Sequence, residues 1–182
     1  MAAGNFRACL ETSTWRPDFD GLDMDSAPGE TWGTRWGVTE MSWQDWQYQH
    51  PDAAEFPVAT KDDFAALYQA KYWNPLRCET LPKGLDLMVF DFGVNCGIGA
   101  SARQLQTVLH RGNVKVAIDG SIGPMTVNET LRLPLGTLIT QTASQHLRYY
   151  QGLAYWPLYG RGWTNRNNTR LDLALKMAGL KE

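Results

Sequence analysis

Carboxylate side chains are concentrated in one segment near the start of the chain, residues 9–39. Glu11 opens this segment, and four aspartates follow it: Asp18, Asp20, Asp23 and Asp25. Glycine, threonine and tryptophan then fill the segment up to Thr39. Hydrolysis of a glycosidic bond needs one carboxylic acid that protonates the leaving oxygen, and a second group that activates water, attacks, or stabilises the sugar cation. The segment therefore predicts a carboxylate-lined groove for a sugar chain.

The acid role suits Glu11 best among these carboxylates. It lies at the end of a short predicted helix, residues 5–12, and next to Leu10 and Trp15. An apolar setting keeps a proton on a carboxyl group, which a general acid requires. The aspartates that follow are candidates for a second, ionised carboxylate in a wetter setting.

Two other interpretations of the segment stay open. The carboxylates could face water in a loop that is stabilised by Asx turns. A Ca²⁺ loop is the other interpretation, because Asp-x-Asp spacing occurs twice in the segment. The spacing of an EF-hand is not met, since the twelfth residue counted from Asp18 is Gly29 rather than a glutamate.

The bulk composition fits one globular domain, or one lobe with a small second lobe attached. The chain has 182 residues, and 43% of them are hydrophobic. The formal net charge of −2 gives no sign of nucleic-acid binding. No apolar stretch reaches the roughly 18 residues of a membrane span, and the N-terminus shows no signal peptide. We therefore expect synthesis in the cytoplasm and no membrane insertion.

Cysteine and histidine spacing gives no sign of metal or redox chemistry. The three cysteines cannot all form pairs and show no CxxC spacing: Cys9, Cys78 and Cys96. We interpret them as buried free thiols, with a nucleophilic Cys96 as the alternative. The three histidines lack metal-ligand spacing, and no metal site is predicted.

Helical periodicity dominates the chain and predicts a mainly α fold. The expected helices span residues 5–12, 42–49, 60–74, 85–95, 99–110, 127–133, 138–154 and 168–178. Thr60 and Thr126 are expected helix caps, residues 18–36 a long polar loop, and residues 160–166 a glycine-bounded turn. Residues 85–95 are apolar nearly all round, which fits a buried strand or a buried helix, and we favour a central helix.

An ordered set of motifs runs through the whole chain. It begins with "TRWGVT" at residues 34–39 and ends with "AIDGSIGPMT" at 117–126 and "GRGWTNR" at 160–166. Between these lie the positions of a Y-x-x-x-Y-W helix, a D-x-x-x-N helix and an L-Q helix: Tyr68, Tyr72, Trp73, Asp91, Asn95, Leu105 and Gln106. Taken together and in this order, the motifs resemble the glycoside hydrolase family 108 lysozymes, which carry a C-terminal peptidoglycan-binding-like region.

The resemblance implies a lysozyme-like helical domain with a long N-terminal active-site loop. Residues 1–95 would form the catalytic lobe, and residues 96–182 a helical peptidoglycan-binding-like lobe, packed as one compact unit. The implied activity is that of a phage-type N-acetylmuramidase, which needs neither metal nor organic cofactor. Its partner would be bacterial peptidoglycan, reached after release from the host cytoplasm. We also expect the protein to be a monomer.

The resemblance also implies roles for single residues. Glu11 would be the general acid, either Asp25 or Asp20 the second carboxylate, and Thr34 the third member of the site. Asp25 fits through its Pro-Gly neighbours, and Asp20 through its distance in sequence from Glu11. Candidates for binding the sugar chain are Trp36, Tyr72, Trp73 and Asn95. Core packing is the alternative for the two aromatic residues of the Y-W helix, and a structural role is the alternative for Asn95.

The chain departs from the family pattern near the predicted acid. Thr12 and Ser13 replace two glycines after Glu11, and the D-P-G-G motif is not intact around Asp25. These departures keep a second hypothesis open, namely a non-catalytic peptidoglycan-binding module such as a phage virion component. A wall endopeptidase is a third hypothesis.

Overall fold

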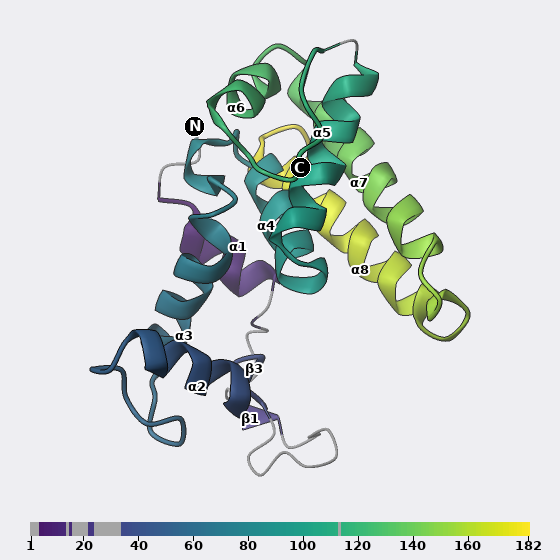
Figure 1. The fold of residues 1–182 in the computed structure, drawn as a ribbon. Helices are drawn as coiled ribbons and strands as arrows, with labels where there is room; N and C mark the ends of the chain where they lie inside the picture. The colour runs from purple at the N-terminus through teal and green to yellow at the C-terminus, as the bar shows by residue number, and fades with distance from the viewer. Residues whose placement is uncertain (1–3, 14, 16–21, 24–33, 113) are drawn as a thin grey trace. The chain divides into compact units, whose positions relative to one another are not determined.

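The computed structural model describes residues 4–13, 15, 22–23, 34–112 and 114–182. Within these residues the secondary structure is mainly helical, with three strands of two residues each (Figure 1). The predicted mainly α class is confirmed. No helix in the described part of the chain is both long and apolar enough to cross a bilayer.

The elements follow one another along the chain in a simple order. They are α1 (Phe6–Ser13), β1 (Leu22–Asp23), β2 (Thr34–Arg35), β3 (Val38–Thr39), α2 (Glu40–Gln49), α3 (Lys61–Tyr68), a π-helical turn (Gln69–Trp73), a 3₁₀ turn (Cys78–Thr80), α4 (Leu85–Cys96), α5 (Ile98–Arg111), α6 (Pro124–Thr130), α7 (Leu135–Gln151) and α8 (Trp156–Met177). The strands form one antiparallel sheet in the order β1-β2-β3.

The chain divides into two compact units. Leu10–Lys71 form the smaller unit, and Met1–Cys9 together with Tyr72–Glu182 form the larger one. The divisions fall within α1 and within the π-helical turn, whereas the sequence predicts a lobe boundary after residue 95. The predicted assignment of residues 1–95 to catalysis and of residues 96–182 to wall binding stays a prediction.

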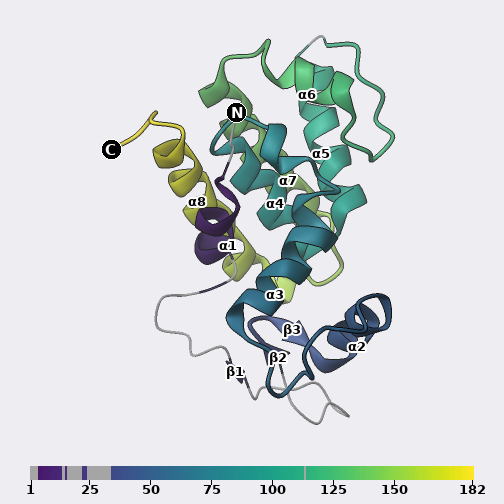
Figure 2. The ribbon, with the colours of Figure 1, turned by 90° about the vertical axis from the view of Figure 1, so that its left-hand side faces the viewer.

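The larger unit is built around α4. Apolar residues lie on nearly all sides of this helix, so it is buried along most of its length, and it packs against α5, α7 and α8 (Figure 2). Its fully buried side chains include Leu85, Leu87, Met88, Val89, Phe90 and Phe92. The predicted central helix is therefore confirmed.

Asp86 ties the start of α4 to the N-terminal residues. Its carboxylate accepts hydrogen bonds from the backbone N–H groups of Gly84 (2.7 Å) and Leu87 (2.8 Å), and from the side-chain amide of Asn5 (2.7 Å). Burial raises the pKa of Asp86, although these hydrogen bonds act in the opposite direction. Gly84 has a φ of +87°, and a Cβ there would lie 2.2 Å from the Ala174 carbonyl oxygen, so only glycine fits.

Asp91 joins α4 to α8 through two arginines. Its Oδ1 lies 2.6 Å from Arg166 Nη2 and 2.9 Å from Arg170 Nε. Only 8% of the Asp91 side chain is exposed, and a buried carboxylate has to be paired. The Arg103 guanidinium of the neighbouring helix lies against the Asp119 carbonyl and Gly120.

Two sequence expectations about the C-terminal half are wrong. Residues 160–166 form no turn, because α8 is continuous from Trp156 to Met177. Trp163 stacks on Tyr150 at 5.4 Å and Arg166 pairs with Asp91, so tertiary contacts outweigh the low helix propensity of the two glycines. Helix α6 is capped by Gly123 with Pro124 in its first turn, and not by Thr126.

The first prediction concerns the Asp91 ion pairs. Asp91→Ala should lower the free energy of unfolding by about 3 kcal/mol, because it leaves two partly buried guanidinium groups without their carboxylate. Denaturant unfolding measures the change. Asp172→Ala is the matched control, since that carboxylate is exposed in its pair with Lys181, and it should change stability little. Equal effects of the two variants would contradict a structural role for Asp91.

The second prediction concerns His146, which is buried, stacks on Phe92 at 3.9 Å, and has no hydrogen-bond partner for Nε2 among the described residues. Burial lowers its pKa from 6.5 to about 3. In the unfolded chain His146 takes up a proton near pH 6.5, whereas in the folded chain it stays neutral down to about pH 3. Stability is therefore complete above pH 6.5 and falls toward pH 3, by up to about 1.4 kcal/mol per pH unit. His146→Leu should remove this part of the slope between pH 7 and pH 5, and an unchanged slope would contradict it.

Candidate active site

A tight hairpin lies in the smaller unit. Strands β2 and β3 are joined by two residues, Trp36 and Gly37, with φ values of +52° and +77°. Two positive φ values suit the type I′ turn of a two-residue hairpin. Glycine adopts them freely, but a bulky residue such as tryptophan is strained there. Strain of this kind concentrates at functional sites, which singles out Trp36.

The Trp36 carbonyl is held by donors from two other parts of the unit. Trp15 Nε1 donates to it at 3.1 Å and the Tyr68 hydroxyl at 3.0 Å. The Trp15 ring also meets the Trp36 ring edge-on at 5.0 Å and the Tyr68 ring at 6.2 Å. The residue that follows α1, the hairpin turn and the end of α3 therefore meet at one carbonyl group.

Helix α3 begins with a strong N-cap that fixes Lys61. Thr60 caps the helix, as the sequence predicts. It forms a reciprocal capping box with Asp63, and these hydrogen bonds lower the pKa of Asp63. Lys61 is the first residue of the helix. Its ammonium lies 4.9 Å from the Trp15 ring centre and 5.2 Å from the Trp36 ring centre, within the range of a cation–π interaction.

Glu11 lies on α1 and faces Lys61. The Lys61 Nζ is 3.3 Å from Glu11 Oε1, and 55% of the Glu11 side chain is exposed. The apolar niche expected around this carboxyl group is therefore not found among the described residues, and the group that faces it there is a cation. An exposed ion pair of this kind contributes at most about 1 kcal/mol to stability, so it is a weak structural device.

Of the other residues predicted for catalysis, the structure describes only Thr34. Asp20 and Asp25 lie outside the described residues. Thr34 lies in β2, where it pairs with Asp23 of β1 and Thr39 of β3. Thr34 is half-buried and belongs to the same unit as Glu11.

The remaining predicted sugar-binding residues belong to the larger unit. Trp73 is buried between Phe6 and Phe90 and donates to Glu79 at 3.1 Å, so core packing is its role in this structure. The Asn95 amide donates to the Asp91 carbonyl oxygen at 2.6 Å, one helical turn back along α4. Tyr72 is half-buried, and burial raises its pKa.

Sequence reasoning missed Lys61 as a member of the site. Its carboxylate partner lies 50 residues away in the chain, and no local pattern links the two. The capping box at Thr60 was the one available signal, since it fixes where α3 begins.

Comparison with known families gives a match to part of the chain. Residues 21–97 match the family model described as glycosyl hydrolase 108. The predicted resemblance to this family is confirmed over this range. The matched range includes Asp25, Thr34 and Trp36, but it begins after Glu11 and Asp20.

Comparison with solved structures gives the fold. The structure of SagA from Brucella abortus is similar with a TM-score of 0.74 and 23% sequence identity, over 96% of this chain and 93% of SagA. At this identity the likeness shows the fold alone, and the predicted lysozyme-like helical fold is confirmed. No curated protein sequence matches the chain.

The third prediction separates Trp36 from Trp15. Trp36→Asn should change the free energy of unfolding by only about 1 kcal/mol, because asparagine tolerates a positive φ and relief of strain offsets the lost ring contact. Trp15→Ala should cost about 3–5 kcal/mol, because only 2% of Trp15 is exposed. Denaturant unfolding of both variants tests this. Equal losses would mean that Trp36 is simply a core residue.

Proposed function

We propose that the protein is a lysozyme that hydrolyses the β-1,4 bond between N-acetylmuramic acid and N-acetylglucosamine, with Glu11 as the general acid. The position of Glu11 carries the proposal. Its carboxylate shares one compact unit with the strained Trp36 turn, in a chain whose residues 21–97 match a glycoside hydrolase family. Glycoside hydrolysis needs a carboxylic acid beside the bound sugar chain.

The second part of the proposed reaction, activation of water or stabilisation of the sugar cation, is assigned to residues in the segment that follows Glu11. Asp25 or Asp20, together with Thr34, would position water or stabilise the developing sugar cation. A separation of about 6.5–9.5 Å between the two carboxyl groups gives inversion at the sugar carbon, and about 5–5.5 Å gives retention. Proton transfer and electrostatic stabilisation carry this reaction, so it needs neither metal nor organic cofactor.

Lys61 has to be displaced before Glu11 can act. The pair at 3.3 Å joins an ammonium to an ionised carboxylate, and a general acid has to carry a proton. The ammonium also lies over the Trp15 and Trp36 rings, where a flat sugar ring would stack. A bound sugar would therefore remove Lys61 from the indole faces and from Glu11 together.

We also propose a substrate, an oligomeric state and a place of action for this activity. The substrate is bacterial peptidoglycan, and the protein acts as a monomeric endolysin that reaches the wall after release from the host cytoplasm. The formal net charge of −2 supports a partner other than nucleic acid.

A wall-binding module without catalysis is the second candidate function. Glu11 is exposed and paired with a cation, and Thr12 and Ser13 stand where the family pattern has two glycines. Under this alternative the Trp36 surface would bind the glycan without cleaving it.

The fourth prediction tests the general acid. Glu11→Gln should lower the rate of cell-wall clearing at least about 100-fold, because general acid catalysis contributes roughly 10²–10⁴. Turbidity of purified walls gives the rate, and co-sedimentation with walls should stay at the wild-type level. Glu55→Gln is the matched control, since it removes an exposed carboxylate from the same unit and should be fully active.

Lys61→Met completes this series. It removes the ion pair and leaves Glu11 in place, so it should retain activity. Wild-type protein that binds walls without clearing them would establish the binding module. Release of free amines without new reducing ends would identify an endopeptidase instead.

A further inference from the structure

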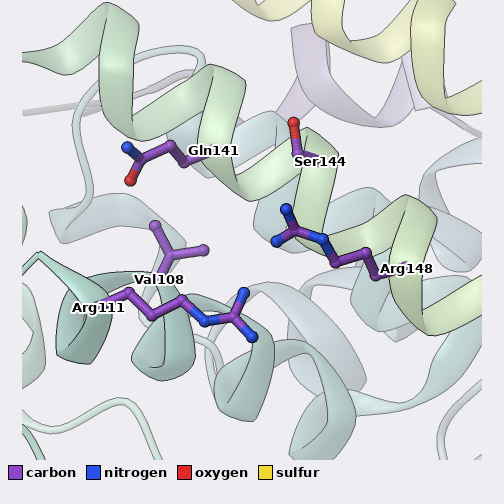
Figure 3. A pocket seen from close by; sticks show the side chains of 5 residues that line it. All are labelled: Val108, Arg111, Gln141, Ser144 and Arg148. Carbon is purple, nitrogen blue, oxygen red and sulfur yellow. The ribbon is translucent and has the colours of Figure 1, made fainter.

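A pocket of about 260 Å³ opens between α5 and α7 in the larger unit. Figure 3 shows the side chains that line it: Val108, Arg111, Gln141, Ser144 and Arg148. The guanidinium groups of Arg111 and Arg148 come from different helices and extend toward the same space. The pocket thus combines an apolar wall with two cations and two neutral polar groups.

The two arginines contact the same amide oxygen, that of Gln145. Arg111 Nη1 donates to Gln145 Oε1 at 2.6 Å, and Arg148 Nη1 approaches the same oxygen at 3.5 Å. The Gln145 amide is itself oriented, because its Nε2 donates to Gln104 Oε1 at 2.8 Å. Each guanidinium has five N–H donors, so both groups keep donors for a ligand.

Neither arginine forms an ion pair with a carboxylate in the described part of the chain. Residues 130–171 contain five arginines and neither aspartate nor glutamate. Three of these five arginines form ion pairs with carboxylates outside this range: Arg166 and Arg170 pair with Asp91, and Arg132 pairs with Glu129. Among the described residues, the side-chain acceptor of both Arg148 and Arg111 is the neutral Gln145.

The position at a helix end explains why each arginine is favourable by itself, but it does not explain why the two guanidinium groups lie close together. Both lie in the last turn of their helices, where a cation is favourable. Two guanidinium groups at one neutral oxygen nevertheless repel each other. An oxyanion would accept charge-assisted hydrogen bonds from both and remove that repulsion.

We propose that this pocket is an oxyanion site that binds a carboxylate or phosphate group. Arg111 and Arg148 supply the charge, the Gln141 amide supplies a further donor, and Val108 forms the apolar wall. The site lies in the unit that does not contain Glu11, and the proposal stands whether or not the chain is a lysozyme. Stem-peptide carboxylates and phosphate-containing wall polymers both carry such a group.

The fifth prediction uses two small probes, inorganic phosphate and N-acetylglycine. Wild-type protein should bind at least one of them in a calorimetric or NMR titration. Arg111→Met and Arg148→Met should each weaken binding roughly tenfold or more, since each loses a charge-assisted hydrogen bond. Arg161→Met removes an exposed arginine of α8 and should bind as wild type. Equal weakening in all three variants, or no binding by wild type, would overturn the proposal.

A second variant tests the pocket rather than its charge. Ser144→Phe fills the space between the helices and leaves both arginines in place, so it should also abolish probe binding. Far-UV circular dichroism confirms that each variant is folded. Probe binding that survives in Ser144→Phe would mean a diffuse surface charge and would overturn the site.

The source of the anion follows from binding to intact walls. Wild-type protein should bind intact walls more tightly than the two arginine variants. If acid removal of phosphate polymers from the walls abolishes this difference, the anion is phosphate. If the difference persists, the anion is a stem-peptide carboxylate. Binding only to anionic phosphatidylglycerol vesicles, with no response to either small probe, would replace the proposed pocket by a lipid-binding surface.

Discussion

The candidate active site depends on one carbonyl group, that of Trp36. It accepts hydrogen bonds from Trp15 and Tyr68, and so holds together three segments that are distant in sequence. These bonds stabilise a tryptophan in a backbone conformation that bulky residues avoid. The indole faces fixed in this way are the ones that Lys61 covers while it pairs with Glu11. The backbone conformation at Trp36 therefore helps to position the aromatic surface beside the Glu11 carboxylate and the Lys61 ammonium.

Charges in the larger unit divide into compensated and uncompensated ones. The two buried carboxylates of α4 are both satisfied, Asp86 by backbone N–H groups and Asn5, and Asp91 by two arginines. Burying either without partners would be prohibitive, so these contacts serve the fold. Arg111 and Arg148 instead share a neutral oxygen at a surface pocket. Charges that the fold does not require are the ones available for ligands.

Local signals in the sequence were sufficient for most of the helices. The all-round apolar pattern of residues 85–95 predicted the buried α4, and Thr60 predicted the start of α3. The helical course of residues 160–166 was not predictable, because contacts of Trp163 and Arg166 with distant helices override two glycines. Trp73 was undecided for the same reason, since its burial depends on Phe6 and Phe90. No local pattern links Glu11 to Lys61, although Thr60 marks where α3, and with it Lys61, begins.

The most direct test of the account is a crystal structure of the Glu11→Gln variant with a bound peptidoglycan tetrasaccharide. We predict that the residue 11 side chain lies about 2.6–3.2 Å from a glycosidic oxygen, with a sugar ring on Trp36 and Lys61 moved from its place over the indoles. A tetrasaccharide bound elsewhere, with Lys61 still between Trp36 and residue 11, would contradict the assignment of Glu11 as the acid.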